Sequence, residues 1–116
     1  MSGSTEVIED LKGPTRALRR MQPDAWKGFG ALHQAAMADG EVPGHTKELV
    51  ALAIAVVKEC DGCIAYHARA AARKGATDAE VSEILSVALL MGGGPASVWA
   101  PRAWDAYREF AERPSN

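Results

Sequence analysis

The sequence lacks the features that would direct a chain to a membrane or to nucleic acid. Its longest apolar run, from Leu49 to Val57, is far too short to cross a bilayer. The first residues are acidic and lack the apolar stretch of a signal peptide. Lysine and arginine number 13 against 15 acidic residues, the net charge is −2, and there is no long basic run. These absences predict a cytoplasmic protein that binds neither membranes nor nucleic acid.

Cysteine is scarce as well, because the chain contains only Cys60 and Cys63. A disulfide between them would close so short a loop that it would add little to the stability of the fold. In a reducing compartment, two cysteines this close in sequence more often serve metal binding or redox chemistry than structure. The pair is therefore the first place to look for a functional site.

The alternation of apolar and polar residues that is typical of β-strands is also missing, and alanine is abundant throughout. The chain has neither internal repeats nor low-complexity segments. Its 116 residues, 47% hydrophobic and 24% charged, suit one folded domain with a single core. We therefore expect one all-α domain over residues 1–116, with about five to six helices.

Glycine, proline and capping residues indicate where these helices begin and end. Asp61 is the expected N-cap of one helix, and Gly75 is the residue expected to end it. Thr77 and Glu80 have the spacing of a capping box at the start of the next helix. Pro101 should kink or restart the last helix. The expected helices cover approximately residues 6–11, 23–39, 45–59, 61–74, 77–91 and 99–110.

The helix expected over 45–59 is apolar nearly all round its circumference. Such a helix is normally buried on all sides, either in the core of a domain or between subunits. Two tryptophans near the C-terminus, Trp99 and Trp104, add further apolar surface. Together these features predict a homo-oligomer with a buried subunit interface.

The stretch ECDGCIAYH brings together the residues with the most reactive side chains. Cys60 is expected just before a helix and Cys63 in its first turn, where the free N–H groups and the helix dipole stabilise a thiolate. His67 follows Cys63 by four residues, and a helical side chain at that position leans back toward the earlier one. The pattern offers a thiol, a base and a second thiol that can close a disulfide.

Spacing alone leaves other interpretations open. Zinc could be held by Cys60, Cys63 and His67, with Glu48 or His45 as a fourth ligand. The cysteines could also be inert and buried. Four other candidate residues have ordinary explanations too. His33 could be a hydrogen-bonded core histidine, Tyr66 a packed ring and Arg69 a solvated charge. Glu48 could be a first-turn acid that suits the helix dipole. Redox chemistry is the interpretation that the pattern favours.

A longer stretch, KELVALAIAVVKECDGCIAYHARAAARKGATDAEVSEILSVALLMGGGPA, resembles the core of the AhpD-like alkylhydroperoxidase family, within the carboxymuconolactone decarboxylase superfamily. The resemblance covers about Thr46 to Ala96. It consists of an acid twelve residues before the first cysteine, the Cys-x-x-Cys pair, a histidine four residues after the second cysteine, the pattern A-x-x-x-G-A-T-D-x-E and a final glycine run. This ordered set is far more specific than any one of its parts.

The resemblance implies an all-helical, obligately oligomeric protein, commonly a trimer or hexamer, that needs no haem, flavin or metal. It implies that the cysteine pair reduces hydroperoxides and is re-reduced by a dithiol partner, such as a lipoyl domain or a thioredoxin-like protein. By position, Cys63 matches the thiol that attacks the peroxide and Cys60 the resolving thiol, while His67 and Glu48 match proton-relay residues.

Some members carry a histidine between the cysteines, where this chain has Gly62. The decarboxylase branch generally lacks the cysteine pair, so decarboxylation is not expected. The alternative is a zinc-binding or redox-sensing helical module without turnover.

Two physical arguments bear on these roles. The helix dipole favours Cys60 as the nucleophile, whereas the histidine favours Cys63; we expect Cys63, because a specific base outweighs a general field and the family position agrees. Glu48 would lie ~18 Å from Cys60 along one straight helix at ~1.5 Å per residue. Glu48 reaches the site only if the helix breaks, the next helix folds back, or a neighbouring subunit supplies it.

Overall fold

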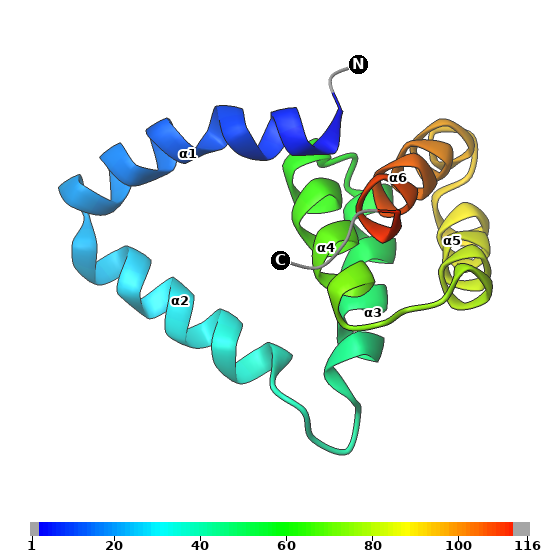
Figure 1. Ribbon diagram of the computed structural model, residues 1–116, viewed down its shortest axis with the longest axis horizontal. Coiled ribbons are helices and arrows are strands. Elements are labelled where there is room, and N and C mark those ends of the chain that lie inside the picture. The colour runs from blue at the N-terminus through cyan, green and yellow to red at the C-terminus, as the bar shows by residue number, and fades with distance from the viewer. Residues whose placement is uncertain (1–2, 113–116) are drawn as a thin grey trace.

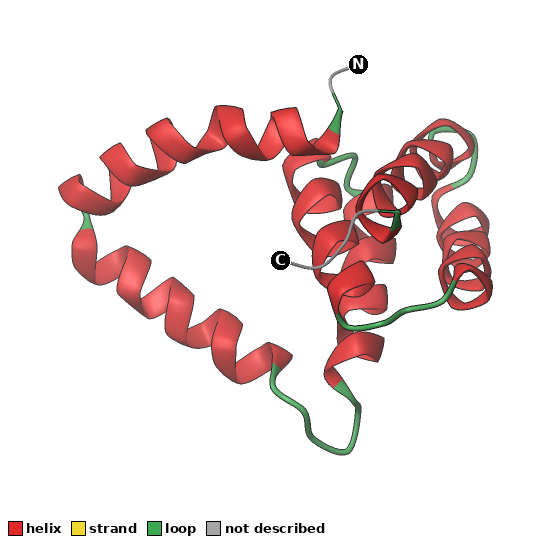
Figure 2. Cartoon of the chain, viewed as in Figure 1, coloured by secondary structure: helices red, strands yellow, loops and turns green. Residues whose placement is uncertain are grey.

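Six α-helices form the part of the chain that the computed structural model describes, residues 3–112, and no strand occurs there (Figure 2). They are α1 (Ser4–Met21), α2 (Pro23–Met37), α3 (Gly44–Val57), α4 (Asp61–Arg73), α5 (Asp78–Gly92) and α6 (Ala96–Ala111). The prediction of an all-α domain is confirmed. None of these helices is long and apolar enough to cross a membrane.

Helices α3 to α6 pack together into the body of the protein, with α4 in contact with α1, α3 and α6 (Figure 1). The core contains large side chains such as Leu52, Val56 and Val81, none of which is exposed to solvent. Much of the rest is alanine, including Ala68 of α4 and Ala103 of α6, both fully buried. Small side chains let helices pack closely. The cysteine-bearing helix is therefore held from several sides.

Helix α1 is much longer than the expected segment over residues 6–11, and that prediction was wrong. The helix continues through Gly13 and Pro14 to Met21. The bond that proline cannot make would go to the carbonyl of Asp10, and both residues are exposed, so water can solvate that carbonyl. The start of α1 is fixed by the carboxylate of Glu109, which accepts hydrogen bonds from the backbone N–H groups of Ser4 and Thr5 at 3.0 and 3.2 Å.

Together, α1 and α2 extend away from the body and return to it (Figure 1). Only Ser4 and Ile8 of α1 are buried, and no residue of α2 is. The large apolar side chains of Phe29 and Leu32 are 63% and 64% exposed. An apolar face on α2 is therefore left uncovered by the described part of the chain.

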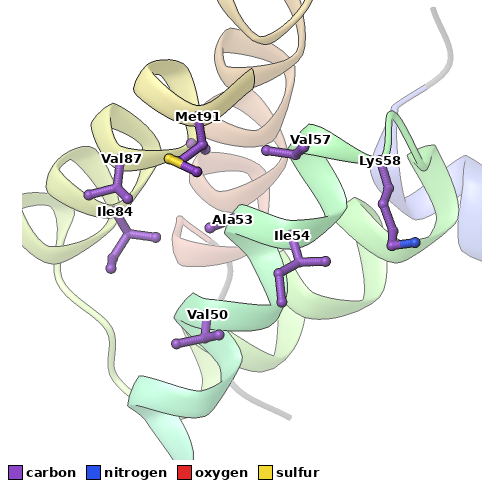
Figure 3. Close-up of a pocket in the computed structure, with 9 residues that line it drawn as sticks. Val50, Ala53, Ile54, Val57, Lys58, Ile84, Val87 and Met91 are labelled. Atoms are coloured by element: carbon purple, nitrogen blue, oxygen red, sulfur yellow. The ribbon is translucent and has the colours of Figure 1, made fainter. Parts of the chain in front are cut away.

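Helix α3 buries one face and exposes the other. Leu49, Leu52 and Val56 lie in the core, whereas Val50 and Ile54 are about half exposed, at 49% and 50%. The prediction that this helix is buried on all sides in the core of one chain was therefore wrong. The alternative, that its second face is buried between subunits, stays a prediction. The exposed face of α3 and a face of α5 line an apolar groove of about 380 Å³ (Figure 3). Its walls include Val50, Ile54 and Val57 from α3 and Ile84, Val87 and Met91 from α5.

The last two helices follow the sequence pattern closely. Thr77 caps α5, and its capping box with Glu80 is complete, as predicted. Helix α6 runs uninterrupted through Pro101, so it does not restart there, and a kink at Pro101 stays a prediction. Pro101 is exposed, and it removes only the bond that its N–H would have made to the carbonyl of Ser97.

Candidate functional site

Cys60 and Cys63 are joined by a disulfide at the N-terminal end of α4, with their Cα atoms 5.2 Å apart. Cys60 is the N-cap of this helix, and its Sγ accepts a hydrogen bond from the backbone N–H of Cys63 at 3.2 Å. The expected N-cap, Asp61, is instead the first helical residue, where its charge suits the helix dipole. Cys63 is exposed and Cys60 half-buried, so these are not buried, inert cysteines.

The turn between α3 and α4 explains why Cys60 has the capping position. The N–H of Glu59 bonds to the carbonyl of Val56, and the N–H of Cys60 bonds to the carbonyl of Ala55, which is the Schellman pattern of a helix end. Glu59 takes the left-handed conformation that this motif requires, with φ of 56°. The residue that completes the end of α3 is therefore also the residue that begins α4, with no loop between them.

This tight turn folds α4 back against α3 and brings Glu48 to His67 within one chain. Glu48 Oε2 lies 2.9 Å from His67 Nδ1. The Glu48 side chain is only 2% exposed, and its second oxygen lies 3.8 Å from Nζ of Lys74. Of the three ways in which Glu48 could reach the site, folding back of the next helix is the one observed. The interpretation of Glu48 as a first-turn acid was wrong, because α3 begins at Gly44 and its first turn contains no acidic residue.

The Glu48–His67 pair is built as an oriented base. A carboxylate can only accept, so His67 donates its Nδ1 proton to Glu48 and keeps Nε2 free to exchange protons. His67 lies four residues after Cys63, a rise of about 6 Å along α4. Glu48 thus orients an imidazole one helical turn after Cys63, and this order of groups is typical of sites where an oriented base activates a nucleophile.

Gly62, between the cysteines, lies under α1. A Cβ atom placed on Gly62 would come within 3.1 Å of Leu11 Cδ1. This is tighter than ordinary van der Waals contact, so a side chain there would require Leu11 to move. Helix α1 packs directly over the Cys-x-x-Cys turn, and this packing leaves little room for a histidine in place of Gly62.

A second group of residues surrounds His67 on its other side. His33 was expected in the core, but it is exposed. Its ring stacks with that of His67, with 6.4 Å between the ring centroids. Both histidines line a cavity of about 270 Å³ together with Glu48, Tyr66 and the basic side chains of α4. Tyr66 and Arg69 were expected from the sequence as possible lining residues, whereas Arg73 and Lys74 were not. Arg73 follows Arg69 by four residues and Lys74 follows Ala70 by four, and this helical spacing was the available signal.

His45, the other candidate zinc ligand, is engaged elsewhere. Its Nε2 lies 2.9 Å from Glu80 Oε2, and this hydrogen bond, with a second from the N–H of Thr77, lowers the pKa of Glu80. Within residues 3–112, no three side chains of the ligating types come together in a group that could hold a metal ion.

Comparison with known proteins agrees with this picture. A model of the carboxymuconolactone decarboxylase family matches residues 23–106. An uncharacterized protein of Cupriavidus necator is 41% identical over 87 residues, covering 75% of this chain and 77% of that protein. An uncharacterized protein of the cox locus of Paracoccus denitrificans is 40% identical, covering 65% of this chain and 68% of that protein.

Solved structures extend the similarity to the whole fold. A carboxymuconolactone decarboxylase family protein of Legionella pneumophila superimposes with a TM-score of 0.91 at 38% identity, covering 94% of this chain and 97% of that chain. A Thermotoga maritima member, described as having a possible involvement in an antioxidative response, gives 0.79 at 31% identity, covering 92% and 91%. The chain therefore belongs to the carboxymuconolactone decarboxylase, or AhpD-like, family.

Proposed function

We propose that this protein is a thiol-dependent reductase of alkyl hydroperoxides. The observation that carries the proposal is the position of the Cys60–Cys63 disulfide one helical turn before His67, whose ring is oriented by the buried carboxylate of Glu48. The dithiol form of a reversible disulfide supplies two electrons, and an oriented base beside it supplies proton transfer. The suggested antioxidative role of the Thermotoga relative is consistent with this chemistry.

In the proposed reaction the dithiol form of the protein reacts first. The thiolate of Cys63 attacks the O–O bond of the hydroperoxide, an S–O bond forms, and the alkoxide that leaves takes a proton from the His67 imidazolium. Cys60 then attacks the sulfenic acid of Cys63, the S–S bond forms, and the hydroxyl leaves as water. The sum is dithiol plus hydroperoxide giving disulfide, alcohol and water, so that both electrons of the O–O bond reduction come from the two sulfurs.

An external dithiol completes the cycle by thiol–disulfide exchange. Its first thiolate attacks the protein disulfide, its second releases the mixed disulfide, and Cys60 and Cys63 return as thiols. Cys63 is the more exposed residue of the pair. A dihydrolipoyl group or a thioredoxin-like protein provides the required chemistry.

The two cysteines should behave differently when each is replaced. Cys63→Ser should bring peroxide consumption to background, because no thiol is left beside His67. Cys60→Ser should consume about one equivalent of peroxide and stop as a sulfenic acid that dimedone traps. Exchange of these two phenotypes would exchange the roles of the cysteines. Full turnover in both variants would show that the pair is not the reaction centre.

A redox sensor without turnover is the second candidate, and the same disulfide favours it. A sensor would be oxidised once by peroxide but would not be recycled by a dithiol reductant at a useful rate. Continuous consumption of hydroperoxide by the wild-type protein with dihydrolipoamide distinguishes the two functions.

A further inference from the structure

The cavity beside His67 carries more positive charge than the rest of the chain would suggest. The whole protein has a net charge of −2, yet residues 66–74, YHARAAARK, contain three cations and no acid. Arg69, Arg73 and Lys74 all line the cavity, and Glu48 is its one acidic lining residue. Positive charge is thus concentrated on the side of His67 that faces away from the cysteines along α4.

Two of the three cations are left without a counter-charge. Lys74 lies 3.8 Å from Glu48, whose other oxygen binds His67. Neither Arg69 nor Arg73 forms an ion pair with any residue in 3–112. By contrast Arg108, elsewhere on the surface, pairs with both Asp78 and Glu112.

Arg69 is also held in place. Its guanidinium lies over the ring of Tyr66, 5.3 Å from the centroid. Stacking on an aromatic ring orients a guanidinium and leaves its N–H donors free at the edge. Arg73 stands one turn further along the same face, in the last turn of α4, where it also suits the helix dipole. Two guanidinium groups one turn apart can share an acid group between them.

We propose that this cavity binds the carboxylate of the substrate, so that the protein selects hydroperoxides that also carry an acid group. This inference rests on the proposed function. Glu48 in the same cavity disfavours a doubly charged group such as a phosphate monoester, which leaves a carboxylate as the best match. Arg69 and Arg73 follow Cys63 by six and ten residues, about 9 and 15 Å along the helix. The peroxide and the acid group would therefore lie on the order of 10 Å apart, as in a hydroperoxy fatty acid.

The kinetic test compares a hydroperoxy fatty acid with its methyl ester in the presence of a dithiol reductant. We expect kcat/KM to favour the acid by about tenfold or more, since an ester cannot form charge-assisted hydrogen bonds. The combined variant Arg69→Gln/Arg73→Gln should lose this preference. Arg102→Gln is the matched control, because that guanidinium also lies over an aromatic ring, Trp99, at 4.7 Å, but does not line the cavity.

A binding measurement separates failure of this inference from failure of the proposed function. Octanoate and octanol are titrated calorimetrically into the oxidised protein, which cannot react with either. Octanoate should bind more tightly than octanol, and the Arg69→Gln/Arg73→Gln variant should weaken octanoate by about tenfold. Unchanged octanoate affinity in that variant would overturn the inference whether or not peroxide is consumed. Equal turnover of acid and ester would also overturn it, while leaving the peroxidase function intact.

Discussion

His67 and Glu48 depend on each other for both chemistry and stability. Glu48 is almost fully buried, and His67 is the only described residue that donates a hydrogen bond to it. Removing the imidazole leaves a buried carboxylate with one cation 3.8 Å away. A buried acceptor without a donor costs about 1–3 kcal/mol. A loss of activity in His67→Ala would therefore mix two causes.

His67→Gln separates the two causes, since its amide can still donate to Glu48 but cannot act as a base. In the reduced wild-type protein we expect alkylation of Cys63 at neutral pH to be faster than for a free thiol with a pKa near ~8.5. His67→Gln should lose this advantage while keeping most of the thermal stability, and His67→Ala should lose both. The control is His45→Gln, at a histidine that binds Glu80 instead. If the His67→Gln rate profile overlays the wild type, His67 is a structural residue.

Glu59 offers a test of the turn that presents the cysteines. The left-handed conformation destabilises a residue with a side chain by roughly 1–2 kcal/mol, whereas glycine adopts it without this cost. Glu59→Gly should therefore raise the free energy of unfolding by up to about 1 kcal/mol in a urea titration, after the extra chain entropy of glycine is deducted. Lys58→Gly is the control: Lys58 has a φ of −80°, so glycine should destabilise the protein there. Equal effects at the two positions would contradict this account of the turn.

The residues of the candidate site could be predicted from the sequence, but their contacts could not. Spacing indicated Cys60, Cys63 and His67, and the resemblance to the AhpD-like family indicated Glu48. The contact between Glu48 and His67 depends on a helix end at Glu59, and the usual marker of such an end, a glycine, is absent there. Gly75 marks the equivalent end of α4, with a φ of 86°, and that boundary was predicted correctly.

Among the helices, α3 and α5 are coupled by a hydrogen bond with a consequence for acid stability. His45, in the first turn of α3, bonds to the capping-box residue Glu80 of α5 and lowers the pKa of that carboxyl. An unfolded chain with the ordinary pKa binds the proton more readily than the folded one. The contribution of Glu80 to the free energy of unfolding is therefore fully present above about pH 4.3. It is lost as the pH falls toward the lowered pKa of the folded state.

Glu80→Gln tests this coupling, because glutamine can still complete the capping box but cannot titrate. The free energy of unfolding of the wild type should fall more steeply below about pH 4.3 than that of Glu80→Gln. Glu83→Gln, at an exposed position on the same helix, should keep the wild-type slope. Parallel curves for all three proteins would show that the bond from His45 does not favour the charged form of Glu80.

The helices that matched the sequence pattern best are those with complete local signals. The capping box predicted the start of α5, and α2 began at Pro23 as expected. Helices α1 and α6 both continue through a proline, Pro14 and Pro101, for one physical reason: a proline removes a single hydrogen bond, and a helix tolerates this where water can solvate the carbonyl that is left. Exposure of that carbonyl is a property of the folded chain and cannot be seen in the local sequence.

For the molecule as a whole, apolar surface is the main feature left unexplained by one chain. Helix α2 has no buried residue, and the groove between α3 and α5 is lined by partly or largely exposed valine, isoleucine and methionine (Figure 3). A continuous apolar groove of this kind on a protein of this size is typical of a subunit contact. A second copy of the chain, which carries the same apolar faces, is the occupant we propose.

We predict a homo-oligomer, trimer or hexamer, whose mass by light scattering is three or six times the 12.3 kDa of one chain. Ile54→Glu, in the groove, should shift the mass toward the monomer, because a charge would be buried in an apolar contact. Val42→Glu, at a residue 45% exposed in the loop before α3, should leave the mass unchanged. A wild-type mass near 12.3 kDa at micromolar concentration would contradict this prediction.

The central claim is that hydroperoxide oxidises this particular pair of cysteines to a disulfide. The protein is reduced without oxygen, freed of reductant and given one equivalent of an alkyl hydroperoxide, and the mass of the peptide spanning Cys60 and Cys63 is then measured. We predict that the peptide loses two hydrogens as the disulfide forms and that one equivalent of the alcohol appears. A peptide that remains a dithiol while the peroxide persists, or while oxidation occurs at other residues, would contradict the claim.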